Sequence, residues 1–380
     1  MAEVIVAGGG PAGALAAIIL ARAGVQVQVF ERARFPRHKL CGDTLNPGAL
    51  AVLARHLDTT PLLAHSDVID GMVITGPGGV SVRGRYGRGR SGRAITREVF
   101  DHWLIAQAAA AGAHVEEDAP VRELTCRSEG GRARVTGVVV QSGGTTTDHP
   151  ARMVIGADGR RSGIAFGRGL ARQPAQPRRW AIGAYYTGVT GLTSAGEMHV
   201  RDGHYIGVAP LPGGLTNACL VVPHEHGDEA LKAPARVLDK FLAADRDLAA
   251  RFAAARPAGP AVMLGPMAVD GLACGEPGLL LAGDAAGFID PMTGDGLRLA
   301  LAGAELAAAV TLDVLAGRVA PDQAHAVLAA RRRAAFQSKW RFNRTLRALV
   351  ASPRGVAAAA FAARALPSVF ERMIRYAGDC

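Results

Sequence analysis

The chain has 380 residues, of which 49% are hydrophobic, and its formal net charge is +10. This hydrophobic content is enough to bury a sizeable core, so the composition excludes a disordered chain. Five scattered cysteines without a CxxC pair exclude a zinc site and a disulfide framework, and they indicate a reduced, cytoplasmic protein. The apolar first 20 residues include four glycines and a proline, so we expect neither a signal peptide nor a membrane span there.

The N-terminal segment has the pattern strand, glycine loop, helix, strand, acid. A short apolar run, Glu3 to Ala7, precedes a loop with the sequence GGGPAG at residues 8–13. Good helix formers follow from Ala14 to Ala23, and a second apolar run from Val25 to Phe30 ends at Glu31. This order predicts a βαβ unit that binds a dinucleotide.

Each glycine of this loop has a separate physical reason. Gly8 permits the tight turn, Gly10 lets the backbone approach a pyrophosphate, and Gly13 lets the helix pack on the strand. The alternative is a glycine-rich turn in an ordinary βαβ unit, and the segment alone does not choose FAD over NAD. We expect cofactor contacts from Gly8, Gly10, Pro11, Ala12, Gly13, Glu31 and Arg32.

Two later segments, 68–94 and 180–222, alternate like strands and contain turn residues. We expect them to form one antiparallel sheet, which by the family resemblance given below covers the flavin's face and forms the wall of a substrate pocket. Its wall candidates are individually better explained as structural residues, and they are Tyr185, Tyr186, His199, His204 and Tyr205. The arginines of 83–93 indicate a solvated hairpin tip, with an RGG-like nucleic-acid segment or an NADPH 2′-phosphate site as alternatives.

Two apolar runs end in acids. Met153 to Ala157 precedes Asp158-Gly159, and Gly278 to Ala282 precedes Gly283-Asp284. An acid at the end of a parallel strand can bind a ribityl hydroxyl.

The turn 289–297 contains a proline and two glycines, and a helix expected to reach about Ala316 follows it. Its N–H groups and helix dipole would favour negative charge on a flavin pyrimidine ring. We interpret Asp290 and Asp295 in this turn as solvated residues, with a part in proton movement as the alternative.

The chain after Ala330 is helical and basic, with seven Lys or Arg residues between 331 and 347. We expect a helix packed on the domain with its basic face in water. The alternative is an interfacial helix that contacts a membrane and reaches a lipid-like substrate.

The three motifs together resemble the flavoprotein superfamily of p-hydroxybenzoate hydroxylase-type monooxygenases, flavin-dependent halogenases and geranylgeranyl reductases. Members carry a GxGxxG, a central DG and a late GD motif in this order, as residues 1 to about 320 do here. The segment 95–104 is similar to the family's R-x-x-F/L-D-x-x-L helix start, and 35–43 resembles a K-x-C-G loop beside the flavin. The resemblance implies cofactor contacts from Lys39, Cys41, Arg97, Val121, Asp158, Gly159, Gly283, Asp284, Pro291, Gly294, Gly296 and Leu297.

Several of these positions have a structural alternative. Arg97 could instead pair with a nearby acid, Val121 could be a core valine, and Cys41 could be a small buried hydrophobe. No catalytic residue is assigned, and the weak candidates are Cys41 and Tyr205. We expect no metal ligand set.

The motifs point to different branches of the superfamily. Gly287 and Cys41 favour the reductase-like branch, whereas Gly207 and Ala209 replace two aromatics of the reductases' Y-x-W-x-F-P pattern, which argues against an identical prenyl substrate. The halogenases' W-x-W-x-I-P pattern is not found in the sequence.

We therefore predict an α/β fold with an added β domain: a doubly wound Rossmann-like FAD domain, an inserted antiparallel-sheet substrate domain and C-terminal helices. The expected boundaries are 1–67, 95–170 and 265–325 for the FAD domain, 68–94 and 171–264 for the substrate domain, and 326–380 for the helical segment.

The predicted function is an FAD-dependent oxidoreductase that uses NADH or NADPH, or a separate reductase, as its electron donor. We lean to a monooxygenase that hydroxylates a hydrophobic or aromatic small molecule. The first alternative is a geranylgeranyl reductase-like enzyme that reduces carbon–carbon double bonds of a lipid or isoprenoid. The second is a basic module that binds nucleic acid or membrane and has a vestigial FAD site, although we expect no specific nucleic-acid partner. We expect a cytoplasmic location, with peripheral membrane contact through the C-terminal basic helix as the alternative.

Overall fold

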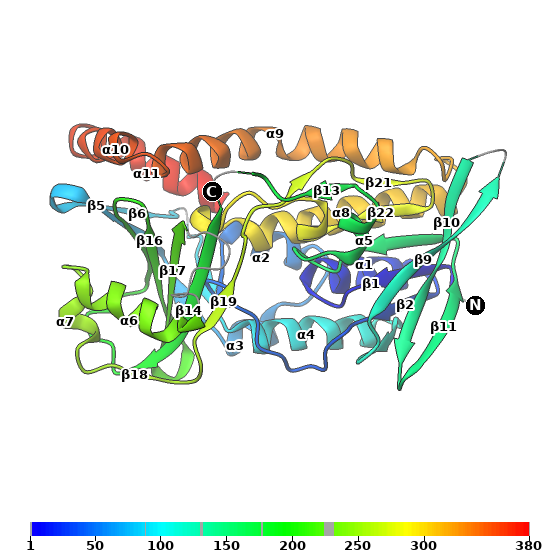
Figure 1. The fold of residues 1–380 in the computed structure, drawn as a ribbon, viewed down its shortest axis with the longest axis horizontal. Helices are drawn as coiled ribbons and strands as arrows, with labels where there is room; N and C mark the ends of the chain where they lie inside the picture. The colour runs from blue at the N-terminus through cyan, green and yellow to red at the C-terminus, as the bar shows by residue number, and fades with distance from the viewer. Residues whose placement is uncertain (1, 88, 130–131, 176–177, 224–231, 380) are drawn as a thin grey trace.

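A mainly parallel sheet forms the centre of the molecule (Figure 1). The structure is a computed structural model that describes residues 2–87, 89–129, 132–175, 178–223 and 232–379. In spatial order the sheet contains β21 (Gly275–Glu276), β22 (Leu279–Leu281), β12 (Met153–Gly156), β1 (Val4–Ala7), β2 (Val27–Phe30) and β8 (His114–Glu116). All pairs are parallel except β21 with β22. The strands are short apolar runs because both faces of the sheet are covered.

The two faces of this sheet are covered differently. Val4 and Val6 of β1 face helices, and they share a core with α1 (Pro11–Arg22), α4 (Arg97–Ala110) and α8 (Gly296–Leu315). Ile5 and Ala7 face the opposite way and pack with a three-stranded antiparallel sheet. That sheet has the order β11 (Thr145–Pro150), β10 (Arg132–Ser142) and β9 (Val121–Glu129). The Rossmann-like fold class is confirmed, and the small sheet on the second face is an addition that the sequence patterns did not predict.

A second large sheet lies at one end of the parallel sheet (Figure 1). Its order is β18 (Arg256–Pro257), β14 (Arg179–Thr187), β17 (Leu215–Pro223), β16 (Tyr205–Leu211), β15 (Ala195–Val200), β5 (Gly71–Gly76) and β6 (Val80–Arg85), and β19 (Val262–Leu264) also pairs with β14. The two chain segments predicted to share a sheet do so. They meet in the parallel pair β15–β5, whereas the other pairs are antiparallel.

Alternation divides the side chains of this second sheet between two environments. Ile182, Ile206 and Leu220 pack under α6 (Pro234–Ala244). Their neighbours Ala181, Tyr205 and Val221 point to the other face and form a separate apolar cluster. This second face borders the cavity described below.

Three helices close the chain: α9 (Ala324–Val350), α10 (Pro353–Ala365) and α11 (Pro367–Gly378). Helix α9 packs along α8, and α11 packs on β6 (Figure 1). The basic residues of α9 do not all face water, because Arg332 and Lys339 are buried. The Lys339 ammonium lies 3.4 Å from a carboxylate oxygen of Asp379, so the interpretation of a basic face in water is wrong for these two positions.

Short elements complete the fold. They are the helices α2 (Pro47–Ala54), α3 (Thr60–Ala64), α5 (Gly163–Gly167) and α7 (Ala249–Phe252), the 3₁₀ turns η1 (Pro77–Gly79), η2 (Pro212–Gly214), η4 (Gly283–Ala286) and η5 (Pro291–Thr293), and the strands β3 (Thr44–Leu45), β4 (Asp67–Ile69), β7 (Gly92–Ala94), β13 (Ala171–Arg172) and β20 (Asp270–Gly271). In the part of the chain that the structure describes, every helix is too short or too polar to span a bilayer.

Candidate flavin site

The three glycine- and acid-containing segments meet at one cavity of about 210 Å³ between the parallel sheet and the second sheet. Most of the predicted cofactor residues line it, although they come from distant parts of the chain. These residues are Gly10, Pro11, Ala12, Lys39, Cys41, Arg97, Gly159, Gly283, Asp284, Pro291, Gly294, Gly296 and Leu297. Tyr205, one of the two weak catalytic candidates, also lines the cavity.

The start of α1 presents bare backbone to this cavity. Gly10 is the N-cap residue and supplies no capping side chain, so within the described part of the chain the N-cap leaves the first N–H groups of the helix uncapped. A Cβ on Gly10 would meet only the Arg37 guanidinium within 4 Å, at 3.6 Å. Gly8 and Gly13 lie below the loop, where a Cβ on Gly13 would come within 1.8 Å of the Gly8 carbonyl oxygen. The loop is therefore tightly packed beneath and open above Gly10, as an anion-binding turn requires.

The acid at the end of β2 lies outside the cavity lining. One Glu31 carboxylate oxygen accepts the Gly9 N–H at 2.7 Å and the other accepts the Ala33 N–H at 3.1 Å. Arg32 is exposed. Val121 begins β9, two residues after Ala119, whose N–H donates to the Glu31 carbonyl at 2.9 Å. Glu31 and Val121 therefore lie near each other, and their contacts with a cofactor remain predictions.

Two buried polar atoms of the segment 157–160 have no hydrogen-bond partner among the described residues. Arg160 lines the cavity and its Nε donates no hydrogen bond, whereas Asp158, whose Oδ1 accepts none, lies between the lining residues Ala157 and Gly159 but outside the lining itself. Asp158 Oδ2 accepts the Ile164 N–H at 3.3 Å, and burial raises the pKa of this carboxyl. Buried polar groups normally have partners, so groups left without one indicate a ligand that supplies them. Arg160 was not singled out from the sequence, although it directly follows Asp158-Gly159.

Basic side chains give the cavity a positive wall. Burial and the Arg97 charge lower the pKa of Lys39 to about 8, with Asp284 opposing them. Arg97 forms a bidentate pair with Asp101, with both distances 2.7 Å, and Arg37 binds the same carboxylate at 3.0 Å. The alternative role for Arg97, pairing with a nearby acid, is therefore present together with its place on the cavity wall.

The turn between η4 and α8 is tied to the second sheet through Asp290. Its carboxylate accepts the Tyr205 hydroxyl at 2.6 Å, the Met292 N–H at 3.0 Å and the Arg179 guanidinium at 3.3 Å. Asp295 is also buried and accepts from the Asn46 amide at 3.3 Å. The interpretation of both acids as solvated turn residues is wrong, because each bonds to side chains from distant segments. Tyr205 thus positions this turn, and burial raises its pKa well above the ordinary value.

The wall opposite the basic residues is apolar. It consists of Leu40, Ala181, Met198, Gly207, Cys219, Val221, Leu264, Met267 and Phe288. Burial raises the pKa of Cys41, and it raises the pKa of Cys219 to about 12, so both thiols stay protonated at neutral pH. Gly207, one of the two small residues in the place of the reductases' aromatics, lies on this wall.

The other wall candidates lie outside the cavity lining. The Tyr185 hydroxyl donates to Asp43 at 2.7 Å, the Tyr186 hydroxyl donates to Asp239 at 3.0 Å, and the His204 ring packs against Phe241. Asp43 also accepts the Asn217 amide at 2.6 Å, and burial raises its pKa to about 6. These contacts join the 35–43 loop to the second sheet, a role that sequence reasoning missed.

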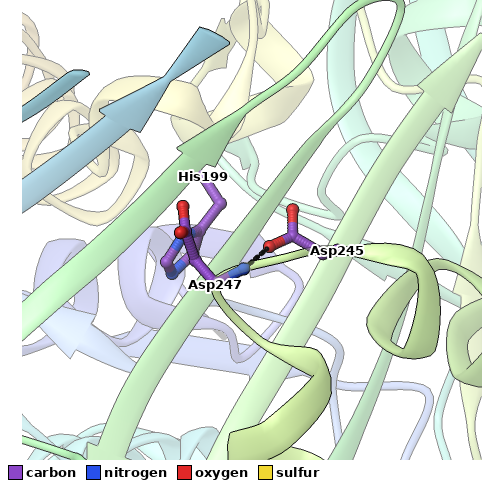
Figure 2. A group of neighbouring side chains, drawn as sticks. All are labelled: His199, Asp245 and Asp247. Atoms are coloured by element: carbon purple, nitrogen blue, oxygen red, sulfur yellow. Dashed lines mark hydrogen bonds between the residues drawn. The ribbon is translucent and has the colours of Figure 1, made fainter. Parts of the chain in front are cut away.

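His199 belongs to a cluster with Asp245 and Asp247 that has the residue types of a metal site (Figure 2). Both ring nitrogens are already engaged, with Thr75 Oγ1 at 2.9 Å and Glu197 at 2.9 Å. The Arg201 guanidinium binds Asp245 at 2.7 Å and Asp247 at 2.8 Å. Arginine thus occupies the positions on these carboxylates that a cation would need, and the cluster is an ion-pair network.

The fit of this cavity to a flavin dinucleotide agrees with comparisons to known proteins. Residues 1–227, more than half of the chain, match the family described as FAD binding domain. The chain is 30% identical over 325 residues to digeranylgeranylglycerophospholipid reductase 1 of Methanopyrus kandleri, covering 82% of this chain and 81% of that protein. It is 32% identical over 329 residues to menaquinone reductase of Mycolicibacterium smegmatis, covering 81% and 75%.

Solved structures show the same fold. A geranylgeranyl bacteriochlorophyll reductase-like protein from Thermoplasma acidophilum superimposes with a TM-score of 0.78 at 22% identity, covering 100% of this chain and 92% of that one. The flavin-dependent halogenase CmlS gives a TM-score of 0.81 at 23% identity, covering 90% of this chain and 63% of that longer one. The structural likeness shows the fold alone. The family match indicates the cofactor, and the two reductase relatives indicate the class of reaction. The chain belongs to the FAD-binding domain family and is an FAD-dependent oxidoreductase.

Proposed function

We propose that this enzyme reduces a carbon–carbon double bond in a hydrophobic molecule that carries an isoprenoid chain. The observation that carries the proposal is the apolar wall of the flavin-side cavity and its continuation into a second apolar cavity. Met198 lines both cavities. The second one, of about 140 Å³, lies between the second sheet and α9 to α11, and its wall includes Ile74, Val82, Leu346, Phe370 and Ile374.

This arrangement suits a molecule with a reactive end and a long apolar tail. The reacting bond would lie in the flavin-side cavity, and the tail would pass Met198 into the second cavity, where it would be shielded from water. The two reductase relatives are named for a digeranylgeranylglycerophospholipid and for menaquinone, and both molecules carry isoprenoid chains. Gly207 leaves room beside the flavin that a bulky aromatic would fill, so the substrate here can differ from theirs.

When bound, FAD supplies hydride transfer between NADH or NADPH and the substrate. The protein supplies placement and electrostatics. Arg160, whose Nε donates no hydrogen bond among the described residues, and Asp284 line the cavity and would hold the cofactor, and the apolar wall excludes water from the substrate side. The pair Tyr205–Asp290 holds the turn that precedes α8 against the substrate sheet.

We further propose that α10 and α11 contact a membrane surface that contains the lipid substrate. Phe361, Leu366 and Val369 are exposed, with 74%, 56% and 40% of their surface accessible. Exposed arginines on the same helices, among them Arg354 and Arg372, match an anionic lipid surface. The second apolar cavity lies directly beneath these helices, because Ala360, Ala363 and Phe370 line it.

Sedimentation with anionic vesicles tests this contact, and a Phe361→Ser/Leu366→Ser variant should remain in the supernatant. Equal sedimentation of both proteins would contradict it.

The reaction is tested by reducing the flavin-loaded protein anaerobically and mixing it with a geranylgeranyl lipid, menaquinone or oxygen. After any quinol has been reoxidised to the quinone in air, mass spectrometry should find the lipid or quinone with two additional hydrogen atoms per carbon–carbon double bond reduced. A product that instead gains one oxygen atom, formed only in air, would support the predicted monooxygenase and overturn the reductase proposal.

A further inference from the structure

A third cavity, of about 230 Å³, lies behind the turn that separates it from the flavin side. Its wall consists of residues 269–274, the turn 283–290, the start of α8 and one face of α9. Gly283, Asp284, Gly296 and Ala300 line both this cavity and the flavin-side cavity. A ligand here would therefore press on the same turn from the opposite side.

The central feature of this cavity is a buried guanidinium without a carboxylate. Arg332 is only 5% exposed, and its Nε and Nη1 meet no acceptor at hydrogen-bond geometry among the described residues. The side chain that acts on this guanidinium from the same wall is the neutral thiol of Cys274, which cannot balance its charge. Its Nη2 reaches the Ala286 carbonyl at 3.5 Å, which is a weak contact. Burying a charge without an anionic partner is costly, so an anion in the cavity would compensate for it.

The acids on the cavity wall have other partners. Asp290 binds Tyr205 and Arg179, and Asp270 lies 3.9 Å from Arg172. The Asp284 carboxylate acts on the flavin side, where its charge opposes the lowering of the pKa of Lys39 and Arg160 by burial. None of these acids forms an ion pair with Arg332 within the described part of the chain.

Further basic and aromatic groups complete the wall. Arg333 and Arg344 line the cavity, and so do Phe336 and Trp340. The Arg332 guanidinium carbon lies 5.5 Å from the Phe336 ring centre and 5.9 Å from that of Trp340. The Asn343 side-chain oxygen is buried and accepts no hydrogen bond. The wall thus offers positive charge, flat apolar faces and an amide acceptor.

We propose that this cavity is a second ligand site that takes an organic anion carrying a planar ring. The anionic group binds Arg332 in the two-pronged manner of guanidinium with carboxylate or phosphate, and the ring packs on Trp340. Two sources share this chemistry: the phosphates and rings of a nicotinamide dinucleotide, or a free aromatic carboxylate. Because the site shares the turn 283–296 with the flavin side, its occupant couples to the cofactor through that turn.

The test is calorimetric titration of the flavin-loaded protein with NADP⁺, salicylate or inorganic phosphate. It measures binding and needs no turnover, so it can fail while the proposed reaction holds. Arg332→Met should weaken binding of the ring-bearing anion by about 10-fold or more, because it removes charge-assisted hydrogen bonds. Arg332→Lys keeps the charge and should weaken binding less. Arg331→Met is the matched control, since Arg331 pairs with Asp313 outside the cavity.

The possible outcomes distinguish a nicotinamide dinucleotide from a free aromatic carboxylate as the ligand, and each of them from the absence of a site. NADP⁺ binding that depends on Arg332 supports the site with the electron donor as its source, and salicylate binding alone supports it with an aromatic acid. Phosphate binding as tightly as either would overturn the ring part of the proposal. No binding, or binding unchanged in Arg332→Met and Arg332→Lys, would overturn the site. Arg332→Met should melt at the same temperature as the parent or higher, because it removes an uncompensated charge, and a purely structural Arg332 would give a lower melting temperature.

Discussion

Two buried polar regions of this molecule differ in how their charges are satisfied. In the ion-pair network around His199, every carboxylate has a basic partner, and Arg251 binds both oxygens of Glu197 at 2.7 and 2.8 Å. At the flavin-side cavity, Arg160 Nε and, next to the cavity, Asp158 Oδ1 have no partner among the described residues, and the backbone over Gly10 is open. The first region completes its interactions within the chain, whereas the second leaves them for a ligand.

The difference separates structural from functional polar groups in a chain rich in arginine. Both regions contain residue types that attract attention in a sequence, and the network even has the composition of a metal site. Only the partners of each group distinguish them. Substitutions in the two regions should therefore have opposite effects on stability and on cofactor binding.

The largest effect is expected at Gly10. Gly10→Val should lower FAD affinity by at least about 100-fold, because the side chain would fill the space above the α1 N-terminus. The backbone of Gly10 has φ −68°, which valine adopts, so the fold should survive. Fluorescence titration of apoprotein with FAD measures the loss. Gly167→Val, at a site with nothing within 4 Å, should bind FAD as the parent does. Equal FAD affinity in the parent and both variants would contradict the claim that the open backbone above Gly10 binds the cofactor.

The network should respond in the opposite way. Arg201→Met leaves Asp245 without its main partner and should lower the free energy of unfolding by about 3 kcal/mol, while FAD affinity stays unchanged. Arg246→Met provides the control, because this exposed arginine lies 3.6 Å from Asp247 and its pair is worth about 1 kcal/mol or less. Urea denaturation and the FAD titration measure the two quantities. A loss of FAD binding with unchanged stability would contradict the structural role of the network.

The apolar wall gives a smaller, substrate-dependent effect. A Cβ on Gly207 would meet its nearest atoms at 3.8 Å, an ordinary contact, so Gly207→Phe should fold and project its ring into the cavity. The KM of a bulky isoprenoid substrate should rise about 10-fold, equivalent to about 1.4 kcal/mol, with FAD affinity unchanged. Steady-state kinetics with short and long substrates measure this. An equal change in KM for both lengths would argue against this wall as the substrate side.

The smallest effect concerns pH. Lys39 has its pKa lowered to about 8, so it is charged below this pH and neutral above it. The charged form attracts the anionic cofactor, and FAD affinity should fall as the pH rises through 8, by about 5-fold in total. Lys39→Met should bind FAD more weakly at pH 7 and lose this part of the pH dependence. A parent protein whose affinity is flat between pH 7 and 9.5 would show that Lys39 does not face the cofactor's charge.

Sequence patterns predicted the helices and strands whose formation depends on residues close together in the chain. The segment 180–222, expected to form strands, begins with the strand Arg179–Thr187, and the helix expected to end near Ala316 ends at Leu315. The sheet β9–β11 was missed because β11 is mostly exposed and polar, so it carries no two-sided apolar pattern. The links from Asp43 to Tyr185 and Asn217 span 142 and 174 residues, a separation at which sequence patterns carry no register.

The candidate site likewise contains residues that the sequence predicts and residues whose position only tertiary packing decides. The glycines and acids that meet at the cavity could be predicted because each follows a strand, and the ends of parallel strands gather at one edge. Arg332 and Lys339 could not be predicted as buried, because helical spacing does not say which polar residues face inward. Their burial depends on where α9 lies against α8 and α11, which is fixed by tertiary packing.

The most direct test of the account is titration of the apoprotein with FAD, for the parent and for Asp284→Asn. Asp284 lines the cavity, and its charge acts on Lys39 and Arg160 rather than on a main structural partner, so its loss should affect the ligand more than the fold. The account predicts one FAD per chain in the parent, about 10-fold weaker binding in Asp284→Asn, and only a small change in the melting temperature of the apoprotein. A parent that binds no FAD, or an Asp284→Asn variant that binds it equally well but melts lower, would contradict the claim that the unpaired groups of this cavity hold the flavin.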